Sequence, residues 1–138
     1  MKFPVLLMGL LMSSFFAVAQ DSWRIVLNGK LVLTSHQSDE TVNTKLIKSS
    51  EWKKNGYLEV TYKETNPGMW HYTLQFSDET GANLLEKVGV KTARISTSTL
   101  RKLLRGKKQL KIYIVISPSN PMIGAPARLI HLGTLKLP

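Results

Sequence analysis

The residues that most often perform catalysis or bind metals are sparse in this sequence, which has three histidines and no cysteine. His36, His71 and His131 are too far apart to form a local metal-binding motif. We expect His71 on the polar face of a strand and His131 to point outward from the last strand. His36 shares a polar loop with Asp39 and Glu40, a trio that could bind a metal or transfer protons, although loops are polar for solvation alone. We predict no metal site and no cofactor.

Nine carboxylates could supply a general acid and a general base, as in glycosidases. The sequence contains no nucleophile elbow, zinc-binding helix motif or glycine-rich phosphate loop. Residues 78–81 (DETG) are typical of a turn. A hydrolase with two carboxylates close in space stays an alternative, but no pair is favoured, and we predict no catalytic residue and no enzyme. The candidates for such a pair are Glu51, Glu59, Glu64, Asp78, Glu79 and Glu86.

Charge is distributed unevenly along the chain, whose formal net charge is +10. Residues 20–86 carry 7 basic and 9 acidic side chains, whereas residues 87–138 carry 11 basic side chains and no acidic one. A basic cluster attracts anionic partners, but a solvated face has the same composition. The cluster predicted to bind a partner falls within 11 positions and comprises Arg101, Lys102, Arg105, Lys107, Lys108 and Lys111.

The partner of this basic surface is expected to be anionic. Phosphates of lipid A, an acidic polysaccharide, nucleic acid and an acidic protein surface all fit electrostatically. Nucleic acid is disfavoured because no aromatic residue interleaves the cluster to stack on bases, since Tyr113 lies beyond it in a strand. We therefore predict a non-enzymatic binding module whose partner is an anionic envelope component or an acidic protein surface.

A carbohydrate-binding module is an alternative, because flat aromatic side chains stack on sugars. Trp70 and Tyr72 are expected on the apolar face of their strand and in the core. Trp52 lies among polar residues beside a turn, in the segment SEWKKNG. It could be an exposed glycan-binding residue, or it could close the end of the fold.

The N-terminal segment has the features of an export signal. Lys2 precedes an apolar run, and Ala17-Val18-Ala19 forms a cleavage signature. We predict a signal peptide at 1–19, and a single domain at 20–138 in the periplasm or outside a bacterial cell. The apolar run is short and is followed by serines, so the cleaved product is not expected to be an integral membrane protein.

The rest of the chain has the pattern of short strands. Asn28-Gly29 separates two apolar runs and predicts a hairpin with a type I′ turn. Further strands are expected at 44–49, 57–63, 69–76, 83–90, 93–97, 109–117 and 128–137, and turns at 55–56 and 66–68. The only expected helix is 99–105, capped by one of residues 96–98 and ended by Gly106. The Pro-rich segment 117–127 is expected to form a loop.

This pattern predicts an all-β fold, an antiparallel β-sandwich of seven to nine strands with one short connecting helix. An eight-stranded β-barrel is the alternative. The 43% hydrophobic content is that of an ordinary globular protein. With no cysteine, the hydrophobic core must stabilise the domain without disulfides.

Two terminal stretches resemble small exported proteins of Bacteroidota-type bacteria. One is the opening W-x-I-x-L-N-G-K of residues 23–30; the other is an I-Y strand, then Ser117-Pro118-x-Asn120-Pro121, then Arg128-x-x-His131-Leu132. The resemblance implies export and a sandwich fold, and it implies no activity and no functional residue. The chain departs from the pattern at Asn120, where an acid is expected, and at Gly133, near a position often occupied by cysteine.

Overall fold

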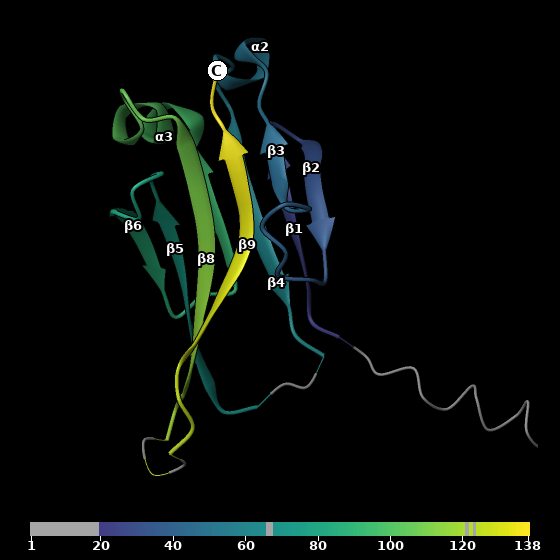
Figure 1. The fold of residues 1–138 in the computed structure, drawn as a ribbon, viewed down its shortest axis with the longest axis vertical. Coiled ribbons are helices and arrows are strands. Elements are labelled where there is room, and N and C mark those ends of the chain that lie inside the picture. The colour runs from purple at the N-terminus through teal and green to yellow at the C-terminus, as the bar shows by residue number, and fades with distance from the viewer. Residues whose placement is uncertain (1–19, 66–67, 121, 123) are drawn as a thin grey trace, which may run out of the picture.

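The computed structural model describes residues 20–65, 68–120, 122 and 124–138. The predicted signal peptide therefore lies outside the described residues, as do Asn66 and Pro67 of one predicted turn. Figure 1 shows the elements in chain order. They are β1 Ser22–Leu27, β2 Lys30–Ser35, β3 Thr44–Leu46, α2 Ser49–Trp52, β4 Tyr57–Lys63, β5 Trp70–Ser77, β6 Asn83–Val88, β7 Thr92–Ser96, α3 Thr97–Leu103, β8 Gln109–Pro118 and β9 Arg128–Lys136.

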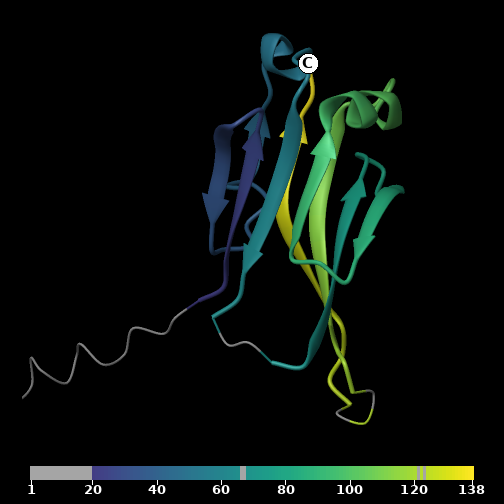
Figure 2. The same cartoon turned by 180° about the vertical axis from the view of Figure 1, so that it is seen from behind.

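The strands form two sheets that lie face to face (Figures 1 and 2). One sheet has the order β2-β1-β4-β7 and the other β3-β9-β8-β5-β6. Among the described residues the two ladders do not join into a closed barrel, so the predicted sandwich is confirmed. One strand pair departs from the antiparallel prediction, because β3 pairs with β9 in parallel.

The first hairpin forms because its two turn residues favour the backbone conformation of the turn. Asn28 has φ 52° and Gly29 has φ 80°, the left-handed conformation that both central residues of a type I′ turn require. Residues 36–43 form the predicted loop. This loop leads the chain from β2 of one sheet to β3 of the other.

The core is built by alternation along the strands. Every second side chain of β8 is buried, from Leu110 to Ile116, and Tyr72, Leu74 and Phe76 of β5 are buried beside them. Trp70 shares the face of these β5 residues, but it is 36% exposed, so its predicted place in the core is wrong. It begins β5 at the end of the sandwich, where it pairs with Pro118 at the end of β8.

The predicted helix 99–105 begins and ends two residues earlier, as α3 at Thr97–Leu103. Of the three candidate caps the structure uses Ser96, whose side chain accepts a hydrogen bond from the backbone N–H of Thr99 at 3.2 Å. Gly106 follows with φ 75°. Leu100 and Leu104 are buried, and Leu103 is partly buried. No helix in the described part of the chain is long and apolar enough to cross a membrane.

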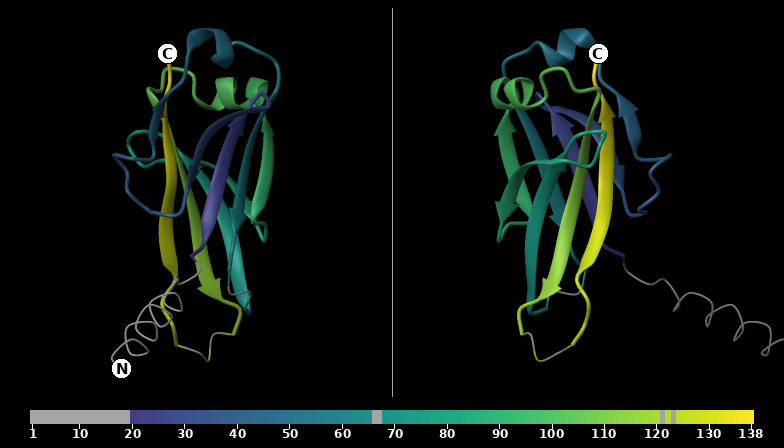
Figure 3. Two further views of the ribbon diagram at one scale, coloured as in Figure 1. Left: turned by 90° about the vertical axis from the view of Figure 1, so that its right-hand side faces the viewer. Right: turned by 60° about the vertical axis from the view of Figure 1, so that its left-hand side comes forward.

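A second helix, the single turn α2, was not expected from the sequence. It lies beside α3 at the end of the sandwich where the chain ends, and the β8–β9 connection lies at the opposite end (Figure 3). The hydroxyl of Thr97 donates to the carbonyl of Lys54 at 2.8 Å and accepts from the N–H of Gly56 at 3.0 Å. These bonds fix the start of α3 against the segment that follows α2.

Candidate anion-binding site

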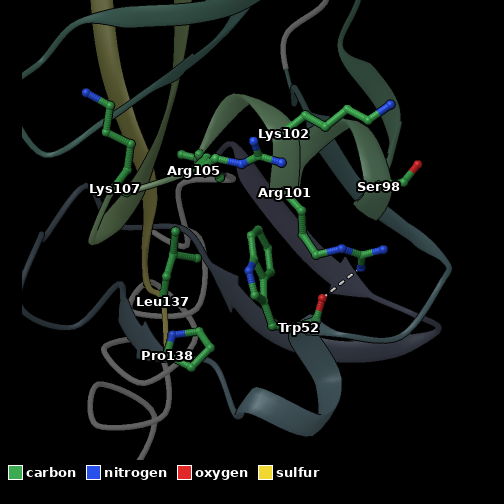
Figure 4. A pocket seen from close by; sticks show the side chains of 10 residues that line it. Trp52, Ser98, Arg101, Lys102, Arg105, Lys107, Leu137 and Pro138 are labelled. Atoms are coloured by element: carbon green, nitrogen blue, oxygen red, sulfur yellow. Dashed lines mark hydrogen bonds between the residues drawn. The ribbon is translucent and has the colours of Figure 1, made fainter.

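A hollow of about 520 Å³ lies between α2, α3 and the residues after β9. Figure 4 shows the indole of Trp52 and the side chain of Leu137 on one side, and the basic side chains of α3 above them. The basic side chains that line the hollow are Arg101, Lys102, Arg105 and Lys107. The lining also contains Trp52, Leu104, Leu137, Pro138, Ser98 and Gly106, and no acidic side chain.

The hollow therefore combines apolar and cationic surfaces. Leu104 is buried, and Trp52 and Leu137 are partly buried against the core. These side chains offer an apolar floor, and in Figure 4 the guanidinium of Arg105 lies above the indole, while the ammonium groups of Lys102 and Lys107 point away from it. Such a surface suits a ligand that has an anionic group attached to an apolar or flat body.

Arg101 contributes positive charge to the hollow and also connects the two helices that line it. Its Nη1 donates to the carbonyl oxygens of Trp52 at 2.9 Å and Lys54 at 3.0 Å, and its Nη2 donates to Oδ1 of Asn55 at 2.9 Å. Because three N–H groups bind the chain itself, Arg101 fastens α2 to α3. The sequence predicted a partner-binding role for Arg101 and gave no sign of this internal one.

Lys107 is also engaged internally. Its Nζ lies 3.0 Å from Oδ2 of Asp78, whose carboxylate is fully buried. Oδ1 of Asp78 accepts hydrogen bonds from the hydroxyl of Thr80 at 2.6 Å, the N–H of Thr80 at 2.8 Å and the N–H of Ala82 at 3.1 Å. The Thr80 hydroxyl and the Lys107 ammonium hold the pKa of Asp78 well below its usual range. The turn predicted at 78–81 is confirmed, and Gly81 has φ 85°.

Glu79, the residue after Asp78, forms a second link between the β5–β6 turn and the chain that follows α3. Oε2 of Glu79 accepts hydrogen bonds from the backbone N–H of Lys108 at 3.2 Å and of Gln109 at 3.4 Å. The β5–β6 turn therefore binds the chain between α3 and β8 with two carboxylates. We call this connection the acidic clamp, and it consists of Asp78, Glu79 and Lys107 with the backbone of residues 108 and 109.

Lys111 does not belong to the hollow. It lies on β8, and its Nζ forms an ion pair with Oε1 of Glu40 at 3.2 Å in the loop before β3. The prediction that all six basic residues form one surface is therefore wrong for Lys111. Within the described residues Lys102, Arg105 and Lys108 are exposed and form no ion pair, and the first two line the hollow.

The structure places the three histidines apart from one another. His36 and His71 are exposed, and no group of three potential metal ligands exists among the described residues. His131 was expected to face solvent, but it is half-buried, its Nε2 lies 2.8 Å from Oγ1 of Thr134, and its ring meets Tyr113 edge-on. Burial lowers the pKa of His131.

The candidate carboxylates are occupied by partners. The ammonium groups of Lys30 and Lys54 both lie 2.8 Å from Oε1 of Glu51 and lower its pKa to about 2. Glu59 pairs with Arg94 at 3.2 Å. Five hollows of the described surface, the one at α2 and α3 included, are each lined by at most one acidic side chain. None of these hollows therefore offers the paired acid and base that a glycosidase uses.

Fold and hollow together define a small β-sandwich protein with an amphipathic, cationic surface site. No family model matches this chain, and no curated protein or solved structure matches it either. The resemblance of its two ends to exported bacterial proteins therefore stays a prediction.

Proposed function

We propose that this β-sandwich is a non-enzymatic binding module of an exported protein, and that it binds an anionic group in the hollow between α2 and α3. One observation carries the proposal: cationic side chains line a hollow with an apolar floor, and no acidic side chain lines it. Lys102 and Arg105 have no ion-pair partner among the described residues, so their charges are available to a ligand.

The alternative of a solvated basic face predicts a different arrangement. Solvated charges on an open surface gain little from one another and are screened by salt. Here four basic side chains line a concavity that also contains an indole ring, and the guanidinium of Arg105 lies above that ring in Figure 4. A partly desolvated hollow strengthens the attraction of a bound anion relative to open water.

A carbohydrate ligand is favoured by a specific observation, because Trp52 lines the same hollow as the basic side chains. The two sequence hypotheses, anion binding and sugar stacking, therefore meet at one site. The ligand class that satisfies both is an acidic saccharide, in which one sugar face stacks on the indole and a carboxylate or sulfate meets Arg105 or Lys102.

The test measures binding of residues 20–138 to oligosaccharides of galacturonate and, as a neutral comparison, of galactose. Wild type is compared with a triple variant, Lys102→Glu, Arg105→Glu and Lys108→Glu, which spares Arg101 and the acidic clamp. We expect the variant to lose about tenfold or more in affinity for the acidic oligosaccharide, as for loss of several charge-assisted contacts.

A matched control reverses Lys45, Lys63 and Lys87, which are also exposed and do not line the hollow. It changes net charge by the same amount and should retain the affinity. If both triple variants bind equally well, the basic surface is not the binding site. If neutral and acidic oligosaccharides bind equally and Trp52→Ala abolishes both, sugar stacking is the function and the charges are incidental.

A further inference from the structure

A second surface lies at the end of the sandwich opposite the hollow, and it is apolar. Four large apolar side chains are exposed there: Met69 is 75% exposed, Trp70 36%, Met122 89% and Leu129 62%. Met69 and Trp70 lie where β5 begins, Met122 lies in the connection between β8 and β9, and Leu129 lies at the start of β9. The connection extends beyond the sheets in Figures 1 and 3. We call these four residues the apolar tip.

The apolar tip is held by defined contacts. Trp70 pairs with Pro118 across the β5–β8 ladder. The carbonyl of Met69 accepts hydrogen bonds from the N–H of Ser119 at 3.0 Å and from its hydroxyl at 2.8 Å. These contacts join the start of β5 to the end of β8, so the exposed side chains of Met69 and Trp70 project from a hydrogen-bonded part of the backbone.

The apolar side chains lie on both faces of the same sheet. Trp70 is on the inward face with Tyr72 and Leu74. Leu129 pairs with Val115, which alternates with the inward-facing Ile114 and Ile116, so Leu129 is on the outward face. A flat protein partner covers one face of a sheet. A lipid interface surrounds an inserted tip and covers both faces.

The backbone of the connection lowers the cost of entering such an interface. Pro118 and Pro126 have no N–H group, so they leave no donor unsatisfied when water is removed. The N–H of Met122 is already satisfied, since it donates to Oδ1 of Asn120 at 3.0 Å. Unsatisfied backbone donors are the main obstacle to placing a loop at the edge of a bilayer.

The charges at this end favour an anionic bilayer. Arg128 is exposed beside the tip, and Lys63 is exposed at the end of β4. Glu64 binds Lys91 at 2.8 Å, and Asp21, which accepts from the hydroxyl of Tyr62 at 2.5 Å, keeps its charge. The three basic side chains at this end therefore outnumber its two carboxylates, which favours a negative surface.

We propose that the apolar tip inserts into the interface of an anionic lipid bilayer, with Met122 of the connection deepest and Trp70 and Leu129, which lie on the strands, nearer the headgroups. Tryptophan is enriched at membrane interfaces because its ring is amphipathic. Apolar insertion combined with basic attraction is the usual basis of peripheral membrane binding. This proposal stands apart from the anion-binding hollow, which lies at the opposite end.

The experiment is sedimentation of residues 20–138 with vesicles of phosphatidylcholine alone and of phosphatidylcholine with phosphatidylglycerol in equal amounts. These residues contain every strand and helix described, and they omit the apolar segment 1–19, which would bind vesicles by itself. We expect binding to the phosphatidylglycerol vesicles, and a blue shift of tryptophan emission that Trp70→Phe removes.

The tip variant is Met122→Ser with Leu129→Ser, and its control is Leu31→Ser with Leu46→Ser, at exposed apolar residues elsewhere. The tip variant should partition about tenfold or more weakly, because each large apolar side chain contributes at least that much when buried. The control should bind as wild type does. All four positions are exposed, so thermal unfolding should show that both variants fold.

Three results would overturn the proposal. The first is no binding to phosphatidylglycerol vesicles. The second is equal binding of wild type and the tip variant, which would mean that surface charge alone attracts the bilayer. The third is a dimer of wild type without lipid that the tip variant converts to a monomer, which would mean that the tip joins two copies of this chain.

Discussion

The two ends of the sandwich differ in shape, in charge and in exposed apolar surface, the properties that determine what a surface can bind. One end carries two helices, a hollow and basic side chains, with Trp52 as the aromatic residue. The other end carries an extended strand connection and exposed apolar side chains, with Trp70 as the aromatic residue. Trp52 lines a concavity (Figure 4), whereas Trp70 begins β5 and is 36% exposed.

This difference shows which parts of such a fold tolerate changes in sequence. The space between the sheets is filled by alternating side chains of β1, β4, β5 and β8, so substitutions there must preserve volume. The ends are free of that constraint. β8 has ten residues, and at about 3.3 Å per residue it separates the two ends by about 33 Å. This distance is about three Debye lengths at 0.1 M salt, so the charges of one end act weakly on the other.

The largest expected effect removes the support that both ends share. Ile114 is fully buried in the middle of β8, so Ile114→Ala should lower the free energy of unfolding by about 2–5 kcal/mol. Both binding activities should then fall together with the folded fraction. Chemical denaturation measures the stability, and loss of one activity without the other would show that β8 does not support the two ends equally.

Breaking the acidic clamp should affect the hollow end only. Asp78 is fully buried with Lys107 beside it, so Asp78→Asn should destabilise the protein at pH 7 and loosen the turn after α3. The folded pKa of Asp78 is depressed below 3.8, so its stabilisation is present above that pH and is lost as pH falls further. Thermal unfolding from pH 7 to pH 3 should therefore show a smaller loss in the variant than in wild type. Parallel curves would contradict this role for Asp78.

A conservative substitution at Arg101 distinguishes the effect of its positive charge from the effect of its hydrogen bonds. Arg101→Lys keeps the positive charge but cannot reproduce the three hydrogen bonds to Trp52, Lys54 and Asn55. We expect a loss of about 1–2 kcal/mol in stability and a weaker affinity for acidic saccharide, because α2 and its indole lose their support. Hydrogen exchange should rise at residues 49–55. Unchanged exchange there, with weaker binding, would instead assign Arg101 to direct contact with the ligand.

The smallest effect is expected at Lys111. Its ion pair with Glu40 lies on the surface and outside the hollow, so Lys111→Gln should cost about 0.2–1 kcal/mol and leave both binding activities intact. Calorimetric titration with the acidic oligosaccharide checks this. Weaker binding by this variant would extend the basic site beyond the hollow.

Local patterns were sufficient to predict most of the fold. Asn28-Gly29 specifies its own turn, and alternation along β5 and β8 identifies the inward face. The parallel pairing of β3 with β9 had no such signal, because it joins segments about 90 residues apart. The four residues of α2 are too few to show helical periodicity.

The candidate site could be predicted only in part. A run of basic residues identified Lys102 and Arg105, since exposure of a charged helix face follows from its composition. The partners of Arg101 and Lys107 lie in other elements, and Lys111 meets an acid 71 positions away, so local sequence could not distinguish structural from available charges. Trp52 reaches the hollow through α2, which the sequence did not indicate.

The most direct test of the central claim, that the two ends bind different partners independently, is a crossed comparison. The charge-reversed variant at Lys102, Arg105 and Lys108 and the Met122→Ser, Leu129→Ser variant are each assayed with acidic oligosaccharide and with phosphatidylglycerol vesicles at about 0.1 M salt. We expect the first variant to lose binding to the saccharide and retain binding to the vesicles, and the second to do the reverse. Loss of both activities in either variant, while it remains folded, would contradict separate action of the two ends.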